Sequence, residues 1–263
     1  MLTSPLNILH ASRRSMFGKS LHLGRPSAPL AGLLGVLGTL TLSGCQAIVS
    51  TEPQAQVRII HATPDTSGLD IYQGPNALAF NLGFGTVTSY IPLTPGVYTI
   101  NADAAGSKQV VSSAKATFAA STQYTVLLGN AAANLQQLTL TDQSQPAPTG
   151  QIALRFINQA TRMSAVDIYL VPAGQKLTTV SPLVSGVVFG TNTGYLNVPT
   201  GIYSLIMIPA GTVPVGNTAA SYTGPQITYA AGAARTIILI DQLPATTPAL
   251  HVITAEDFDS PGT

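Results

Sequence analysis

An internal repeat constrains the fold of this chain more than any other feature of its sequence. The segment VRIIH at 57–61 has a partner in LRFIN at 154–158, an offset of 97 that also relates Asp70-Ile71-Tyr72 to Asp167-Ile168-Tyr169. Farther along, Phe84-Gly85-Thr86 matches Phe189-Gly190-Thr191 at an offset of 105, so the second copy carries eight extra residues. Matched segments in the same order predict a tandem pair of similar domains.

Each copy has the composition of a β-sheet domain. Runs rich in Val, Ile, Thr and Tyr alternate with turns of Gly, Pro, Asn and Ser, and no segment after Cys45 has a convincing helical period. The strands expected in the first copy are 57–62, 69–73, 97–102, 110–118, 124–129 and 135–141. About seven strands in roughly 90 residues are typical of an immunoglobulin-like sandwich. We therefore predict an all-β chain with two such domains, at 56–143 and 151–258, joined by a Pro-rich linker at 144–150 and followed by a tail at 259–263.

Two matched Tyr residues predict a local feature of these sandwiches. Tyr98 follows Pro95-Gly96 at the start of a strand, and Tyr203 follows Thr200-Gly201 in the second copy. A Tyr in this place can pack its ring in the core while its hydroxyl group bonds to a corner of the sandwich.

The first 44 residues have the pattern of an export signal. They contain four basic residues and no acidic one, and 30–42 (LAGLLGVLGTLTL) is an uncharged apolar stretch that is too short for an ordinary transmembrane helix. Leu42-Ser43-Gly44-Cys45 follows at once and resembles the lipobox of bacterial lipoproteins. That resemblance implies cleavage before Cys45, acylation with fatty acids such as palmitate, and membrane attachment through a tether at 45–55. In bacteria with two membranes, Asp directly after the lipidated Cys tends to retain a lipoprotein in the inner membrane. The resemblance therefore favours the outer membrane here, because position 46 is Gln.

A second resemblance covers the body of the chain. The segments RIIHATPD at 58–65, LDIY at 69–72, FGTV at 84–87 and PGVY at 95–98 resemble the bacterial domain of unknown function family 4397. The resemblance covers nearly all of 57–142 and extends more weakly over 152–254. It implies exported or surface-attached proteins with a sandwich fold, often in tandem copies, and it implies no particular activity.

The charge of the chain argues against a nucleic-acid partner, and its single Cys excludes an internal disulfide. Seven basic and ten acidic residues follow position 44, a net charge near −3, and the basic ones form no cluster. Nucleic-acid binding needs clustered Lys and Arg, so we expect no nucleic-acid partner. One Cys cannot form a disulfide within the chain.

Residues for catalysis or metal binding are scarce. After position 44 the chain has two His residues, His61 and His251, and it lacks a Gly-x-Ser-x-Gly elbow. A zinc site needs three or four ligands. We therefore expect no catalytic residue, no cofactor and no metal. An envelope hydrolase or metal-dependent enzyme that uses His61 or His251 is kept as an alternative.

One repeated pair of charges invites a structural hypothesis. Arg58 and Asp70 are 12 residues apart, as are Arg155 and Asp167, and each Arg lies in the first strand of its copy. Because the spacing recurs in both copies, we predict one structural ion pair in each domain.

These features favour a non-catalytic lipoprotein that acts in envelope structure, adhesion or partner binding. The expected partners are the membrane, through lipid on Cys45, and a protein or glycan of the envelope. A glycan-binding module is an alternative, because Tyr residues recur at matched places in both copies. We expect contacts to be made by the insertion within 171–188 and by the loop at 210–225, since binding residues gather on loops.

Overall fold

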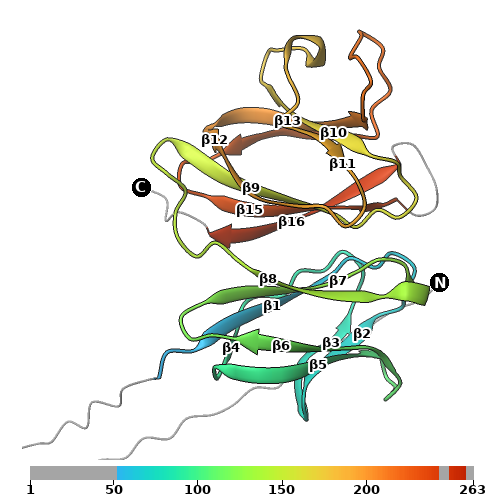
Figure 1. Ribbon diagram of the computed structural model, residues 1–263, viewed down its shortest axis with the longest axis vertical. Coiled ribbons are helices and arrows are strands. Elements are labelled where there is room, and N and C mark those ends of the chain that lie inside the picture. The colour runs from blue at the N-terminus through green and yellow to red at the C-terminus, as the bar shows by residue number, and fades with distance from the viewer. Residues whose placement is uncertain (1–51, 243–248, 259–263) are drawn as a thin grey trace, which may run out of the picture. The chain divides into compact units, whose positions relative to one another are not determined.

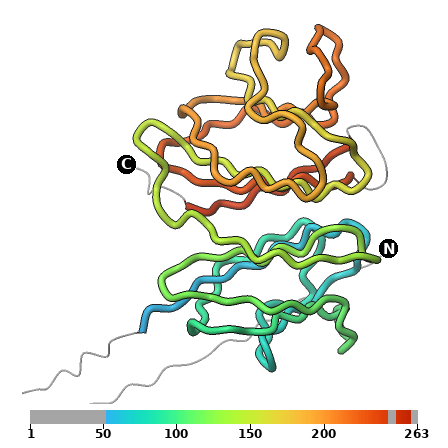
Figure 2. The backbone as a smooth tube through the Cα atoms, viewed as in Figure 1, coloured from blue at the N-terminus to red at the C-terminus, as the bar shows by residue number. Residues whose placement is uncertain are grey.

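A computed structural model describes residues 52–242 and 249–258, and these residues belong to one compact unit. The described residues form sixteen strands and two short 3₁₀ turns, η1 (Ala132–Asn134) and η2 (Leu177–Thr179) (Figures 1 and 2). None of the described segments is a helix long and apolar enough to cross a membrane. The sixteen strands confirm the prediction of an all-β chain.

The first copy is a pair of four-stranded sheets. One sheet has the order β4-β1-β7-β8 and the other β3-β2-β5-β6. Strands β1 and β7 run parallel, and the remaining neighbours are antiparallel. The strands are β1 (Ala55–His61), β2 (Leu69–Gln73), β3 (Asn76–Leu82), β4 (Ile91–Leu93), β5 (Gly96–Ala104), β6 (Val110–Phe118), β7 (Gln123–Gly129) and β8 (Gln136–Thr141).

The second copy repeats this topology strand for strand. Its sheets have the orders β12-β9-β15-β16 and β11-β10-β13-β14, and β9 and β15 form the parallel pair. The strands are β9 (Gln151–Asn158), β10 (Val166–Pro172), β11 (Val184–Val187), β12 (Asn192–Pro199), β13 (Gly201–Pro209), β14 (Tyr222–Tyr229), β15 (Ala234–Asp241) and β16 (Leu250–Phe258). The internal repeat is thus visible in the fold. Each copy has eight strands, and the sequence had not predicted β3 and β4.

Each sandwich has its own apolar core, and the matched Tyr residues lie at its edge. Ile59, Ile71 and Phe118 are buried in the first core, and Phe156, Ile168 and Met207 in the second. The Tyr98 hydroxyl group donates to the carbonyl oxygen of Thr94 at 2.9 Å, and that of Tyr203 to Pro199 at 3.1 Å. The predicted bond between the Tyr hydroxyl group and a corner of the sandwich is confirmed in both copies.

The parallel pair in each copy is buried on both faces. Along β1, β7, β9 and β15 nearly every residue is buried. In contrast, β16 alternates between buried and accessible positions, and every residue of β8 is at least partly accessible. Strands without alternation are those covered on both faces. One face of each pair packs in its own sandwich. The other joins a cluster made by both copies, which contains Ile60, Ala62, Leu127, Ile157, Ile238, Ile240, Ile253 and Ala255.

The Pro-rich segment between the copies is packed against the second copy. Ala147 is buried with Ala153 and Ala234, and its backbone N–H donates to the carbonyl oxygen of Gly232 at 2.9 Å. These contacts fix the path of the chain from β8 to β9.

Candidate functional site

The predicted lipidation site lies outside the described residues. This holds for Cys45 and for the lipobox residues Leu42, Ser43 and Gly44. Acylation of Cys45 therefore stays a prediction from the sequence.

The predicted ion pair between Arg58 and Asp70 is wrong. Arg58 is only 2% exposed and extends across to the other copy, where it pairs with Asp257 and donates to the carbonyl oxygen of Glu256 at 2.6 Å. Its Nε donates to Thr125 Oγ1 at 2.8 Å within its own copy. The partner is thus 199 positions away in sequence rather than 12.

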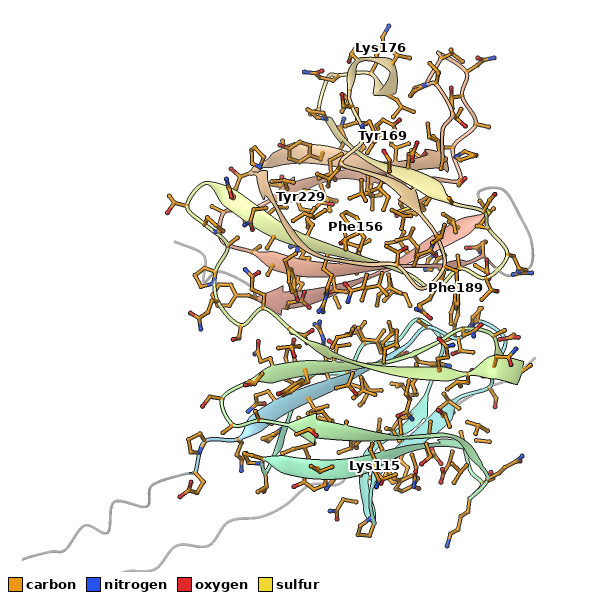
Figure 3. The ribbon with its side chains drawn as sticks, viewed as in Figure 1. Lys115, Phe156, Tyr169, Lys176, Phe189 and Tyr229 are labelled. Atoms are coloured by element: carbon orange, nitrogen blue, oxygen red, sulfur yellow. The ribbon has the colours of Figure 1, made fainter. Side chains whose placement is uncertain are left out.

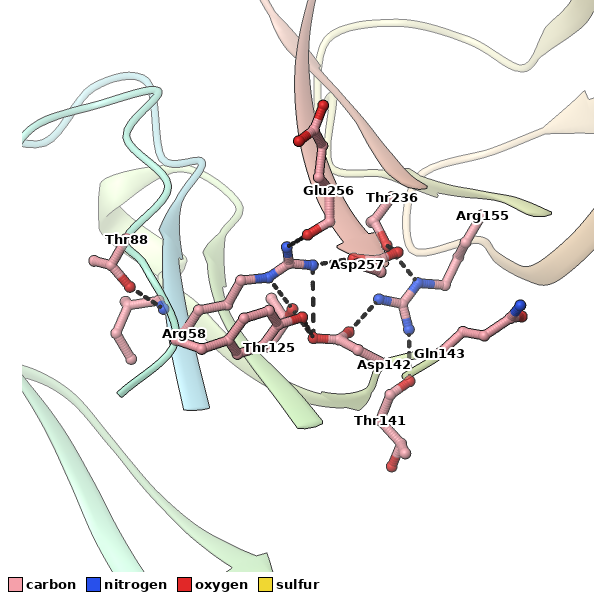
Figure 4. A network of polar contacts seen from close by, with 12 residues as sticks. Arg58, Thr88, Thr125, Thr141, Asp142, Gln143, Arg155, Thr236, Glu256 and Asp257 are labelled. Carbon is pink, nitrogen blue, oxygen red and sulfur yellow. Dashed lines mark hydrogen bonds and ion pairs between the residues drawn. The ribbon is translucent and has the colours of Figure 1, made fainter. Parts of the chain in front are cut away.

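Arg155 makes the reciprocal contacts, so its predicted pair with Asp167 is also wrong. It pairs with Asp142 at 2.6 Å, donates to the carbonyl oxygen of Thr141 at 2.9 Å, and donates to Thr236 Oγ1 at 2.9 Å (Figure 4). Each Arg therefore bonds to a Thr of its own copy and to an Asp of the other copy. An interface in which equivalent residues exchange roles is the arrangement found in a two-fold symmetric dimer.

Two Tyr residues complete this interface network. The Tyr90 hydroxyl group donates to Asp142 at 2.8 Å and that of Tyr195 to Asp257 at 2.7 Å, while each ring lies against the guanidinium group of its own copy. Burial raises the pKa of both Tyr hydroxyl groups, and the neighbouring carboxylates raise it further. The Tyr groups stay protonated and act as donors.

The charges of the network balance. Burial alone lowers the pKa of Arg58, but Asp257 and Asp142 outweigh this effect, and the net result is a raised pKa. Two guanidinium groups therefore face two carboxylates in a buried space. These ion pairs connect the two copies, and the charged groups bond to one another.

Asp70 and Asp167 accept hydrogen bonds from backbone N–H groups rather than from Arg side chains. Asp70 accepts from the backbone N–H groups of Asn81 at 2.7 Å and Gly106 at 3.0 Å. Asp167 accepts from Gly186 at 2.8 Å and Gly211 at 2.9 Å. All four donor residues have positive φ, a backbone conformation that Gly adopts readily. The Asp recurs in both copies because it bonds to backbone N–H groups, one in an irregular neighbouring strand (β3 or β11) and one in a turn (Gly106 or Gly211).

His61 is a buried structural residue. Its Nδ1 lies 3.0 Å from the carbonyl oxygen of Leu82 and its Nε2 lies 2.7 Å from Thr66 Oγ1. Asn158 takes its place in the second copy and donates to the carbonyl oxygen of Val187 at 3.1 Å, the equivalent of Leu82. Burial lowers the pKa of His61, which favours the neutral ring.

His251 lies on β16 and is exposed. In the described segments, no group of three or more His, Cys, Asp or Glu side chains is arranged to hold a metal ion.

The outer sheet of the second copy is covered by its own loops. Tyr169, Val171 and Ile208 lie on the outer face of β10 and β13, where Leu177, Val180 and Ala220 pack over them. Leu177 and Val180 belong to the insertion, and Ala220 to the long β13–β14 connection, which both rise above this sheet in Figures 1 and 3. Part of each loop predicted to make contacts is therefore used to cover the sheet. Val213 and Val215 remain exposed.

The matching face of the first copy is open. There the β2–β3 turn is only Gly74-Pro75, and the β5–β6 connection is only 105–109. A cavity of about 300 Å³ lies on this face, lined by Tyr72, Gly74, Pro75, Asn101, Asp103 and Lys108. Phe80 lies beside it with 69% of its surface exposed, and its ring is 6.1 Å from that of Tyr72 at 86°. This open face is the candidate binding site.

The chain is similar to one family of unknown function and, distantly, to several solved structures. The model of the family Domain of unknown function (DUF4397) matches residues 55–169, which contain the first copy and the first two strands of the second to Tyr169. The match agrees with the resemblance in the first copy. No curated protein matches the sequence.

Three solved structures resemble the chain weakly. The structure of CBMbc (family CBM26) from Eubacterium rectale Amy13K in complex with maltoheptaose has 12% identity, covers 78% of this chain and 98% of its own, and has a TM-score of 0.24. A streptococcal virulence factor that binds alpha-glucan has 8% identity, coverages of 71% and 93%, and a TM-score of 0.23. The Bacillus anthracis TIE protein has 12% identity, coverages of 72% and 34%, and a TM-score of 0.22. Similarities this weak carry no argument about function.

Proposed function

We propose that this chain is an exported, lipid-anchored protein that binds a partner at the cell envelope without catalysing a reaction. The anchor is the lipid on Cys45, which the position of the lipobox directly after the apolar stretch supports. Multiple acyl chains on one Cys residue would hold a protein firmly at a membrane.

The observation that carries the binding role is the contrast between the outer sheets of the two copies. In the second copy this face is apolar and covered by the chain's own loops. In the first copy the same face is open and carries a cavity with aromatic and polar groups. A cavity that combines aromatic surface with a few polar groups is the usual form of a binding site.

The use of the buried polar groups also supports binding rather than catalysis. Both buried Arg residues and Asp142 and Asp257 bond to one another, and His61 bonds to a backbone carbonyl oxygen and a Thr. A nucleophile with an adjacent base and an orienting acid needs such groups to be available for a substrate.

The test is chemical cross-linking of the anchored protein in living cells, followed by mass spectrometry of what is attached. A Cys45→Ala variant is the control and should leave the membrane fraction and lose any partner that is confined to the envelope. A partner recovered reproducibly with the wild-type chain and absent with Cys45→Ala supports the proposal. Recovery of the same material with both chains contradicts it.

The enzyme alternative needs a separate test. Replacing His61 and His251 by Ala, alone and together, should leave the cellular role of the protein intact, provided that thermal unfolding shows a folded chain. Loss of that role in a folded His251→Ala variant would favour the enzyme.

A further inference from the structure

We infer that the open face of the first copy binds a neutral saccharide, with Tyr72, Phe80, Asn101 and Asp103 as its main contacts. This inference rests on the proposed binding function and names its site and its class of ligand. It follows from the aromatic pair, from an unpartnered carboxylate and from the comparison of the two copies.

The aromatic pair offers an apolar surface beside the cavity. Tyr72 lines the cavity, and the ring of Phe80 lies nearly perpendicular to it. Leaving a Phe side chain 69% exposed keeps apolar area in water, which burial against a ligand would remove. A sugar ring has an apolar face of C–H groups that packs on an aromatic ring, while its hydroxyl groups point sideways to polar partners.

The polar partners lie next to this surface. Asp103 is 8% exposed, and its Oδ1 has no hydrogen-bond partner among the described residues. A buried acceptor without a donor is costly, so a ligand that brings a donor gains free energy. Asn101 lies two residues away on the same face of β5 and accepts from Ser113 Oγ at 2.7 Å, which leaves its amide N–H groups as donors.

This arrangement of one acceptor and one donor suits a pair of neighbouring hydroxyl groups. One hydroxyl can donate to the Asp103 carboxylate while the next accepts from the Asn101 amide, because each hydroxyl group can do both. The cavity of about 300 Å³ is at the small end of the range of roughly 300–1,000 Å³ for small-molecule sites. A short stretch of a glycan chain fits that size.

The second copy shows that the fold does not need these polar groups. Its residues at the positions of Asn101 and Asp103 are Ile206 and Ile208, and both pack beneath the covering loops. Where the face is closed, it is apolar, and where it is open, it carries an amide and a carboxylate. Asn101 and Asp103 therefore occur where the face is accessible, which favours a role in binding a ligand.

The charges favour a neutral ligand over an acidic one. Asp103 lines the cavity and Asp70 lies beside it on the neighbouring strand, whereas Lys108 is the one cationic residue in the cavity lining. A phosphate-rich or polyanionic ligand needs clustered cations.

Calorimetric titration of the purified full-length chain tests the inference. The probes are four neutral hexasaccharides, namely maltohexaose, cellohexaose, laminarihexaose and chitohexaose. We expect at least one to bind, and we expect Phe80→Ala and Asp103→Asn each to weaken that binding about tenfold. Thermal unfolding of each variant shows that it is folded. Because the chain has no Trp, Tyr fluorescence reports on the same titration.

Val213→Ala is the matched control, since Val213 is 78% exposed on a loop of the second copy. It should change the affinity by less than about twofold. Equal affinity of the wild type and both folded first-copy variants would overturn the assignment of the site. Failure of all four probes to bind would overturn the saccharide class. Either result would overturn this inference and leave the proposed binding function standing. That function fails only if cross-linking in cells also recovers no envelope partner.

Discussion

Removing one carboxylate from the network between the copies should destabilise the protein strongly. Asp257→Asn keeps the size of the side chain but removes a charge from a group of two Arg and two Asp residues. Arg58 would then be buried with only Asp142 near it, at 3.5 Å, and Asp142 already pairs with Arg155. Breaking a buried pair by removing one partner costs about 3–5 kcal/mol.

The neighbouring residue provides the control. Glu256 precedes Asp257 on the same strand, and its side chain is 57% exposed in a 3.2 Å contact with Arg235. An exposed pair contributes only about 0–1 kcal/mol, so Glu256→Gln should have a small effect. Both variants remove one negative charge, and they differ in whether that charge is buried.

Denaturant unfolding measures the two free energies, and a thermal scan checks them. For a unit of about 200 residues, 3–5 kcal/mol corresponds to a decrease of about 6–20 °C in Tm. If Asp257→Asn lowers the free energy of unfolding by no more than Glu256→Gln does, the network does not hold the copies together and the reasoning is refuted.

Three further predictions follow from the same contacts. Asp167→Asn should lower the free energy of unfolding by about 1–3 kcal/mol, because Asp167 accepts from Gly186 and Gly211; hydrogen exchange should rise at those two amides, and unchanged exchange would contradict this role. Burial lowers the pKa of His61 in the folded chain below its ordinary value of 6.5. The unfolded chain therefore binds a proton at this His more readily than the folded chain does, and the free energy of unfolding should fall as the pH decreases from 7 to 5. His61→Asn, which copies Asn158, should reduce this decrease, and an identical pH dependence would refute it. A double-mutant cycle between Arg58 and Asp70 should give additive effects, since the two make no contact in the described structure; a coupling energy above about 0.5 kcal/mol would argue for the pair that the structure contradicts.

Much of the fold could be predicted from local patterns. The repeat, six strands of the first copy and the bonds of Tyr98 and Tyr203 depend on short segments, so the sequence contains them directly. Strands β3 and β4 were missed. Their residues are partly exposed and β4 is short, so neither has the apolar pattern of a buried strand.

The partners of the charged residues could not be predicted from spacing. Arg58 and Arg155 lie on faces that become buried only when the copies pack together, and their carboxylate partners come from the other copy. One feature of the sequence did indicate this packing. The segments at 57–62, 124–128 and 235–240 are mostly apolar and lack the regular alternation of a half-exposed strand, which indicates that both of their faces are covered.

The open face of the first copy could be recognised only when the two copies were compared in space. Tyr72 and Tyr169 are equivalent in sequence, yet Tyr169 is 3% exposed beneath the loops of the second copy while Tyr72 lines a cavity. The eight extra residues were visible in the sequence, but they were expected to reach outward. Their apolar residues Leu177 and Val180 instead cover the sheet.

Lipid on Cys45 is the central claim on which the proposed setting of this protein depends, and the intact mass of the membrane-extracted chain tests it most directly. We predict a mature chain that begins at Cys45 and carries the added mass of several acyl chains, together with a Cys45→Ala chain that lacks this mass. A mature chain that begins elsewhere, or one whose Cys45 thiol is unmodified, would contradict the account.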